Sequence, residues 1–230
     1  SRLPRKVLAD VGGKTLVARV VERVQRMKTV AQVIVACPQG DWSHIVLALR
    51  GVLDDRYVYD PYCNEADVLM RYRETALRFR ADVVCRITAD CGLLDPALAD
   101  EVVNAGGDWS KVDFATNMHP ATFPQGLACE AFPIDTLERM HRSAKDPYDR
   151  EHVCTWAYKT RSELVRIAPV VNQYGNDADL NWSVDRQSDL DTVRRIYERM
   201  DLANHPEIGW REILAVVRAD RRIDEEMAAK

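Results

Sequence analysis

Two aspartates stand where a predicted strand gives way to a loop or helix, which is where α/β proteins place their chemistry. Asp90 follows the apolar, β-branched segment 82–88, and Asp185 ends the motif NWSVD before a predicted helix. A hard Mg²⁺ ion takes one or two carboxylates together with phosphate oxygens, so this pattern is typical of a metal–phosphate site. Capping of a turn or helix also accounts for either aspartate, and the spacing alone leaves both interpretations open.

The first six residues, SRLPRK, supply cations that suit a polyanion. Arg2, Arg5 and Lys6 lie in a loop stiffened by a proline, and such side chains can neutralise the charge of a triphosphate. An ordinary basic terminus has the same composition, so composition alone does not decide between the two. A third polar group, Arg150 and His152 with a glutamate between them, begins a predicted helix and could clamp a substrate. A first-turn glutamate is also ordinary helix chemistry.

Several other kinds of site are excluded by their spacing. The motif GGKT at 12–15 ends like the phosphate loop of ATPases, but Leu8 stands where that loop needs its first glycine. A turn into a helix is the better interpretation of these residues. His152 has no histidine or cysteine partner at metal-ligand spacing, which argues against zinc. Neither GxSxG nor GxGxxG occurs, which argues against a hydrolase elbow and a dinucleotide loop.

The composition points to a cytoplasmic protein that binds neither nucleic acid nor membrane. The chain has 230 residues and a formal net charge of −4, without the excess of Lys and Arg that nucleic-acid binding needs. Its apolar runs are shorter than the roughly 20 residues of a membrane span. The six cysteines form no CxxC pair and are interpreted as reduced thiols. They are Cys37, Cys63, Cys85, Cys91, Cys129 and Cys154.

Hydrophobic spacing predicts helices and strands in alternation, and therefore one α/β domain over residues 1–230. We expect a doubly wound, mostly parallel sheet with helices on both faces, and a small loop and hairpin excursion over 117–132. The predicted strands are 32–36, 56–59, 82–88, 111–116, 164–171 and 180–184. The predicted helices begin near residue 16, after Asp41, at 66–80, at Asp95-Pro96, and at 134–144, 151–159, 187–200 and 210–217.

Six segments, taken in order, carry a family resemblance that spans nearly the whole chain. They are SRLPRKVL with GGKTLVARVVERV, ADVLMRYRETA, RITADCGLLDP, ATNMHPATFPQGLACEAF, DPYDREHV and NWSVDRQSDLDTVRRIYE. In these segments the chain resembles the cytidylyltransferase-like family of the spore-coat polysaccharide protein SpsF. That family is related to the CMP-sugar-acid synthetases, the acylneuraminate and KDO cytidylyltransferases.

The resemblance implies the doubly wound fold of sugar nucleotidyltransferases, which is also called GT-A-like. It implies that Arg2, Lys6 and Arg86 bind the nucleotide and that Asp90 and Asp185 hold Mg²⁺, with Lys6 and both aspartates catalytic. It also implies homodimerisation through the 117–132 excursion. The residues expected to line the sugar side are Asn117, Gln125, Glu130, Arg150 and His152.

Three departures from the family pattern accompany this resemblance. Family members commonly have a strand and a basic, small-residue loop before SRLP, so we expect the native protein to have further residues upstream, including the sheet's first strand. Arg5 stands where the family commonly has glycine, which crowds or strengthens the phosphate loop. Gly92 replaces a common proline after the metal aspartate and loosens that turn.

These residues predict an Mg²⁺-dependent cytidylyltransferase of surface polysaccharide biosynthesis. It would transfer CMP from CTP to a sugar or sugar acid and release pyrophosphate. A glycosyltransferase that uses a nucleotide-sugar donor is the first alternative, because the same sheet and metal carboxylate serve both reactions. A non-catalytic nucleotide-binding or assembly module is the second, since the changes at Arg5 and Gly92 leave room for it.

Overall fold

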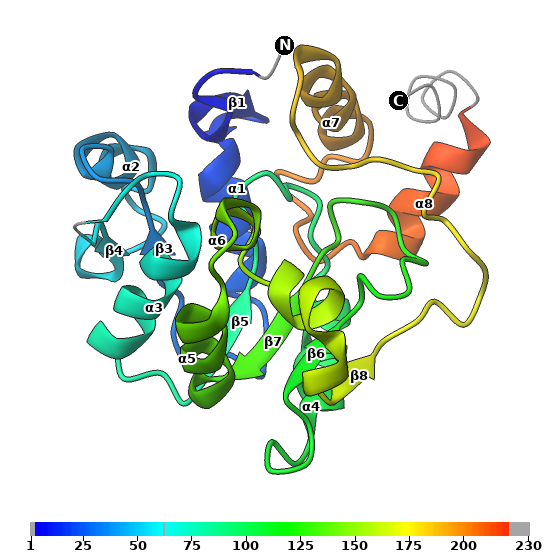
Figure 1. The fold of residues 1–230 in the computed structure, drawn as a ribbon. Coiled ribbons are helices and arrows are strands. Elements are labelled where there is room, and N and C mark those ends of the chain that lie inside the picture. The colour runs from blue at the N-terminus through cyan, green and yellow to red at the C-terminus, as the bar shows by residue number, and fades with distance from the viewer. Residues whose placement is uncertain (1–2, 62, 221–230) are drawn as a thin grey trace.

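A computed structural model of the chain describes residues 3–61 and 63–220. The helices are α1 (Leu16–Val24), α2 (Trp42–Ala48), α3 (Val68–Arg78), α4 (Pro96–Gly106), α5 (Ile134–Ser143), α6 (Pro147–His152), α7 (Gln187–Arg199) and α8 (Trp210–Ala219). The strands are β1 (Asp10–Val11), β2 (Lys14–Thr15), β3 (Val35–Ala36), β4 (Val58–Tyr59), β5 (Val83–Arg86), β6 (Phe114–Thr116), β7 (Glu130–Pro133) and β8 (Ile167–Pro169). Helices and strands alternate along most of the chain (Figure 1), as predicted for an α/β protein.

The central sheet has four strands in the order β5-β7-β6-β8. The strands β5, β6 and β8 run in one direction, but β7 lies between β5 and β6 and is antiparallel to both. The prediction of a mostly parallel sheet is therefore correct for the shared direction of β5, β6 and β8. It is wrong for two of the three neighbouring pairs, because β5–β7 and β7–β6 are antiparallel. The cause is local: Glu130–Pro133 follows a loop rich in Pro and Gly, and the sequence predicted that it belonged to the excursion.

Alternate residues of the sheet enter two different cores, because successive side chains of a strand point to opposite faces. Phe114 and Phe132 pack into one core, which α3 and α5 cover with residues such as Leu69 and Met140. Their neighbours along each strand, including Ala131, pack into a second core that α4 covers on the other face. Helices on both faces of the sheet are thus confirmed (Figure 1).

The N-terminal part forms a separate layer beside the central sheet. The strands β1 and β2 form an antiparallel hairpin whose turn holds Gly12 and Gly13 at φ 60° and 84°, and Thr15 caps the helix that follows. This confirms a turn into a helix for the GGKT motif, because the left-handed φ values suit glycine. The strands β3 and β4 are parallel, and α1 and α2 pack around them.

Several predicted elements are shorter than their hydrophobic pattern. The segment 32–36 pairs only at Val35–Ala36, because β4 offers two residues as its partner. The segment 180–184 makes an isolated bridge between Asn181 and Gln125 in place of a strand. The helix predicted at 151–159 is broken where Val153 adopts φ 57°, so that α6 ends and a new turn begins.

The carboxylate of Asp95 links two distant helices. Its Oδ1 accepts a hydrogen bond from Leu98 N at 2.9 Å and caps α4, and its Oδ2 accepts one from Trp210 N at 2.7 Å, at the start of α8. Asp95 is 5% exposed and holds the C-terminal helix against the segment that follows β5.

Within the described residues, no helix combines the length and apolarity of a membrane span.

Asp113 joins the start of β6 to the residues before β8. It accepts hydrogen bonds from the backbone N and the Nε of Arg166, both at 2.8 Å, and from Arg139 at 3.0 Å. The hydrogen bonds from Arg166, assisted by Arg139, hold the pKa of Asp113 well below its usual range. Because the folded-state pKa is depressed, the stabilisation is complete above the unfolded pKa near 4 and is lost as the pH falls toward the folded value.

We expect Asp113→Asn to lower the free energy of unfolding by about 1–2 kcal/mol at pH 7, since one charge-assisted network is lost. The difference from the wild type should shrink as the pH is lowered from 5 to 2. Urea unfolding followed by circular dichroism at both ends of this range measures it. A difference that stays constant with pH would show that the charge of Asp113 contributes nothing.

Candidate active site

Three of the predicted residues meet in one cluster. The ammonium nitrogen of Lys6 lies 3.1 Å from Asp90 Oδ2 and 2.7 Å from Asp185 Oδ1. These side chains come from the N-terminal loop, from the segment after β5 and from the residue before the N-cap of α7. Figure 1 shows the N-terminal segment beside α7, and Leu3 N donates to the Asp185 carbonyl at 2.8 Å. We call Asp90 and Asp185 the acidic pair, and Lys6 is the lysine that contacts both of them.

Asp90 is held from two sides. The Thr88 hydroxyl donates to Asp90 Oδ1 at 2.5 Å, and Val184 N donates to the Asp90 carbonyl at 3.1 Å. The second contact ties the two acidic segments together through their backbones. Burial alone would raise the pKa of the Asp90 carboxyl, but Lys6 and Thr88 outweigh burial and lower that pKa. The carboxylate is therefore charged at neutral pH.

The Lys6 ammonium responds to the same neighbours. Burial would lower its pKa, whereas the charges and hydrogen bonds of Asp90 and Asp185 raise it. The lysine is therefore fully protonated at neutral pH, and about a quarter of its side chain is exposed. Two negative charges and one positive charge share a partly exposed cluster, which leaves a net negative charge for a further cation.

The helix-capping interpretation of Asp185 is wrong, because another aspartate has that role. Asp189 Oδ2 accepts hydrogen bonds from the backbone N of Asp185 at 2.9 Å and of Arg186 at 2.7 Å. Asp189 thus closes the first turn of α7, and the Asp185 carboxylate is left to contact Lys6. Sequence reasoning missed both Asp189 and Thr88. Asp189 stands at the third helical position, which is the spacing of a capping box and could have identified it.

The acidic pair has the donor chemistry that Mg²⁺ requires. No group of three or more His, Cys, Asp or Glu side chains that could hold a metal ion occurs among the described residues. Mg²⁺ nevertheless needs only one or two carboxylates when phosphate oxygens and water complete its shell. Both carboxylates reach the same nitrogen, and its position stands in for that of a cation.

Arg86 and Glu130 form a buried ion pair on neighbouring strands. They are partners in the β5–β7 register, and the Arg86 guanidinium donates to the Glu130 carboxylate. Glu130 is 4% exposed. Burial would lower the pKa of Arg86, but Glu130 raises it far above the usual range, so the guanidinium is charged. The guanidinium carbon of Arg86 (Cζ) lies over the Tyr72 ring, 5.7 Å from the ring centre. Burial raises the pKa of the Tyr72 hydroxyl to about 12.

Asn117 and Gln125 shape the loop that faces the acidic segments. Asn117 donates to the Leu127 carbonyl at 2.8 Å and accepts from Cys129 N at 2.9 Å, so its side chain closes the loop. The backbone of Gln125 bonds to Leu180 and Trp182, which lead to Asp185, and its side chain is exposed. Gly126 has φ 102°, and a Cβ there would lie 2.5 Å from the Trp182 carbonyl carbon, so this close approach requires glycine.

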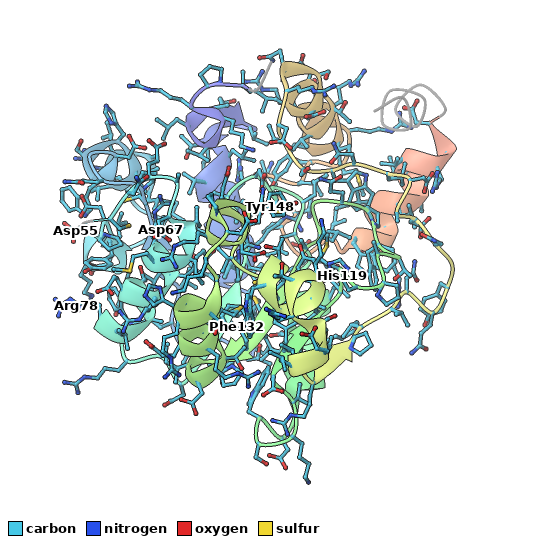
Figure 2. All side chains as sticks on the ribbon, viewed as in Figure 1. Asp55, Asp67, Arg78, His119, Phe132 and Tyr148 are labelled. Atoms are coloured by element: carbon cyan, nitrogen blue, oxygen red, sulfur yellow. The ribbon has the colours of Figure 1, made fainter. Side chains whose placement is uncertain are left out.

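Arg150 joins three helices. Its Nε and Nη2 contact Asp67 Oδ2 at 2.8 Å and 2.7 Å, and it also donates to the carbonyls of His141 and Ala144. These bonds connect α6 to the ends of α3 and α5. His152 is the last residue of α6, and its ring centre lies 4.2 Å from that of Tyr148. Figure 2 labels Asp67 and Tyr148 in this part of the molecule.

The predicted residues thus fall into several groups. Direct contacts join Lys6 with Asp90 and Asp185, and they join Arg86 with Glu130. No contact between described residues brings Arg150 or His152 to either group, and Arg2 lies outside the described residues. Sequence reasoning did not identify His119, a loop histidine that Figure 2 labels. Its ring packs against that of Tyr158, with ring centres 3.7 Å apart.

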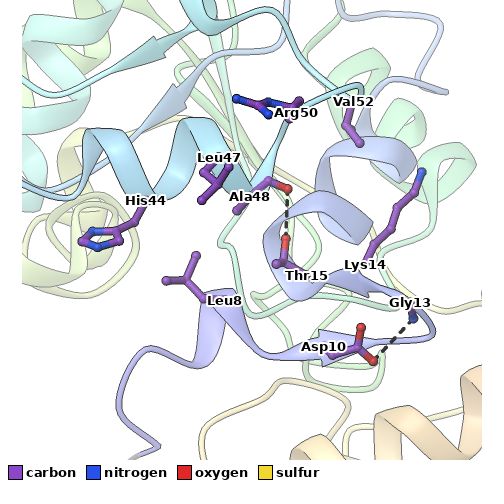
Figure 3. A pocket seen from close by; sticks show the side chains of 10 residues that line it. All are labelled: Leu8, Asp10, Gly13, Lys14, Thr15, His44, Leu47, Ala48, Arg50 and Val52. Carbon is purple, nitrogen blue, oxygen red and sulfur yellow. Dashed lines mark hydrogen bonds between the residues drawn. The ribbon is translucent and has the colours of Figure 1, made fainter.

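A cavity of about 490 Å³ lies between the start of α1 and α2, and its lining does not include the acidic pair (Figure 3). Lys14 and Arg50 lie on its wall together with apolar side chains such as Leu8 and Leu47. The Thr15 hydroxyl donates to the Ala48 carbonyl at 3.3 Å across the cavity wall and joins the start of α1 to α2. Because its lining contains neither Asp90 nor Asp185, we place the candidate chemistry at the acidic pair.

Comparisons with known proteins agree with this fold and order of motifs. The cytidylyltransferase family profile matches residues 1–208. An uncharacterized protein of Methanocaldococcus jannaschii is 24% identical over 88% of this chain and 81% of its own length. The 3-deoxy-manno-octulosonate cytidylyltransferase of Geobacter sulfurreducens is 34% identical over 45% of this chain. The match spans 39% of that enzyme.

Two solved structures share the fold. A cytidylyltransferase from Leptospira borgpetersenii superposes with a TM-score of 0.87 at 23% identity, covering 97% of this chain and 91% of its own. A CMP:2-keto-3-deoxy-manno-octonic acid synthetase in complex with CTP superposes with a TM-score of 0.64 at 16% identity, covering 87% of this chain and 94% of its own. Since the family profile spans nine tenths of the sequence, the chain belongs to the cytidylyltransferase family.

Proposed function

We propose that the protein transfers CMP from CTP to a sugar or sugar acid, with release of pyrophosphate, in the biosynthesis of a surface polysaccharide. The observation that carries this proposal is the meeting of Asp90 and Asp185 at one ammonium group. Two carboxylates and a lysine suit an Mg²⁺-bound triphosphate, because the metal and the lysine both neutralise phosphate charge. Family membership and the relatives named above support CTP and a sugar acid as substrates.

Each residue of the cluster has a role in this reaction. Asp90 and Asp185 would hold Mg²⁺, which supplies charge neutralisation for the α-phosphate and the departing pyrophosphate. Lys6 would donate hydrogen bonds to phosphate oxygens, and Thr88 keeps the Asp90 carboxylate in one orientation. A substrate hydroxyl attacks the α-phosphorus in line, and the bond to the β-phosphate oxygen breaks. Most of the acceleration then comes from positioning and electrostatics.

Pyrophosphate release tests the proposal directly. The full chain is incubated with CTP, Mg²⁺ and a panel of sugar acids, amino sugars and phosphorylated sugars, and released pyrophosphate is counted enzymatically. We expect release with one acceptor class, abolished by EDTA and restored by Mg²⁺. Turnover of a CDP- or UDP-sugar without pyrophosphate would favour the glycosyltransferase. CTP binding with no turnover of any acceptor would favour the non-catalytic module.

A further inference from the structure

The Lys6 ammonium occupies the place between the two carboxylates that a shared cation would take. Its nitrogen contacts Asp90 Oδ2 and Asp185 Oδ1 at hydrogen-bond distance. A divalent ion that bridged the same two oxygens would sit about 2.0–2.1 Å from each. An ammonium group and a bridging metal cannot fit there together, and their positive charges repel each other strongly at such separations.

Without Lys6 the two carboxylates would face each other with their charges unbalanced. Asp90 is only 22% exposed at its side chain, so water does little to screen it, whereas Asp185 is about half exposed. The lysine therefore stabilises the arrangement of both aspartates before any ligand arrives. The same contacts make Lys6 a competitor for any metal ion that binds there.

The backbone of Arg5, just before Lys6, is in a conformation that residues other than glycine seldom adopt. Arg5 lies in the left-handed region, with φ 53° and ψ 28°, and immediately precedes the short 3-10 turn Lys6–Leu8. A non-glycine residue in this region is strained, and such strain gathers at segments that change conformation. The Arg5 side chain is exposed and has no hydrogen bond or ion pair to a described residue. Lys6 therefore directly follows a residue whose backbone is strained.

We propose that Lys6 is a displaceable counter-ion, which keeps divalent metal out of the acidic pair until nucleotide is bound. This rests on the proposed function, because the phosphates of CTP are the new partners that draw the ammonium away. Metal alone must compete with Lys6 for both carboxylates. Metal that arrives with nucleotide does not, since the phosphates accept the lysine's hydrogen bonds. Metal and nucleotide then bind with positive coupling, which is reciprocal between the two ligands.

Mn²⁺ binding to the nucleotide-free protein tests this proposal. Mn²⁺ serves as a paramagnetic probe in place of Mg²⁺, and the free ion is counted by electron paramagnetic resonance during a titration. We expect Lys6→Met to bind Mn²⁺ at least tenfold more tightly than the wild type in the absence of nucleotide. Arg78→Met removes one exposed positive charge at the end of α3 and should change the affinity less than threefold. Lys6→Gln repeats the test if Lys6→Met unfolds, as judged by circular dichroism.

Each outcome separates this proposal from the function on which it rests. Equal Mn²⁺ affinity in the wild type and both Lys6 variants, with binding still sensitive to Asp90→Asn, overturns the counter-ion role and leaves the metal site in place. A similar gain in Lys6→Met and Arg78→Met also overturns it, because a general charge effect would then account for the result. Mn²⁺ that binds no variant, with or without CTP, overturns both the counter-ion role and the proposed metal site.

Discussion

Asp90→Asn is expected to lower the rate of pyrophosphate release from CTP by about 10²–10³-fold, the usual effect of losing one preorganised electrostatic contact. The substitution keeps the size of the side chain and its bond with Thr88, but it removes the charge that would hold Mg²⁺. The loss should appear mainly in kcat, because the interaction acts where charge develops in the transition state. Steady-state kinetics with the acceptor found in the panel measure it.

Asp135→Asn is the matched control for this loss. Asp135 is exposed in the first turn of α5, and no hydrogen bond joins its side chain to a described residue. We expect its kinetics to equal those of the wild type. Full Mg²⁺-dependent turnover by Asp90→Asn would remove Asp90 from the mechanism. Circular dichroism should show both variants folded, since Lys6 still contacts Asp185 in each of them.

Glu130→Met is expected to lower the free energy of unfolding by about 3–5 kcal/mol, because it leaves the Arg86 charge buried without its partner. The Arg86 Nε already has no hydrogen-bond partner among the described residues, so the guanidinium has little to replace the lost carboxylate. Arg86→Met should cost a similar amount. The double variant should cost less than the two single changes together, since two apolar side chains can pack where two charges were.

The pair Arg73–Glu138 provides the comparison for this cycle. It is also a direct arginine–glutamate ion pair, with Arg73 Nε 2.8 Å from the Glu138 carboxylate, but both side chains are about a quarter exposed. We expect Glu138→Met to cost less than about 1 kcal/mol, as is usual for surface ion pairs. Equilibrium urea unfolding of all the variants measures these costs. Additive costs at Arg86 and Glu130 would mean that the pair does not act as a unit.

The same cycle separates the stability role of Glu130 from its expected role on the sugar side. If Glu130 contacts the acceptor and Arg86 contacts the nucleotide, the double variant should be stable and should have raised KM values for both the acceptor and CTP. If the two side chains only balance each other's charge, both KM values should stay near those of the wild type. Two readouts on one variant thus decide between packing and recognition.

The sequence identified individual polar residues as candidates, but it did not predict their partners. Asp90 and Asp185 were identifiable because each follows an apolar stretch, yet spacing could not tell a metal ligand from a cap. That distinction depends on Asp189, whose carboxylate takes the backbone bonds of α7. The meeting of Lys6 with residues 84 and 179 positions away is a tertiary contact that no local pattern contains. The family resemblance implied that the three residues share one site, but it did not predict their direct contact.

The fold was predicted least well where local composition and tertiary pairing disagree. The strand β7 has four residues and follows a Pro- and Gly-rich loop, so its pattern is typical of an excursion. Its place in the sheet comes from pairing with β5 and β6 on either side. Val153 shows the opposite failure, since a helical pattern runs through 151–159 and the chain still turns there. The start of α4, where Asp95 is the N-cap, and both ends of α7 were predicted closely.

The contact between Lys6 and Asp185 also has a consequence for how the protein is made. Ribosomes add about 5–20 residues per second, so Asp185 follows Lys6 into the growing chain after roughly 10–35 s. Until then the N-terminal loop has neither its ion pair with Asp185 nor the backbone bond from Leu3. A partly synthesised chain therefore cannot assemble the acidic pair with its lysine until translation has passed Asp185.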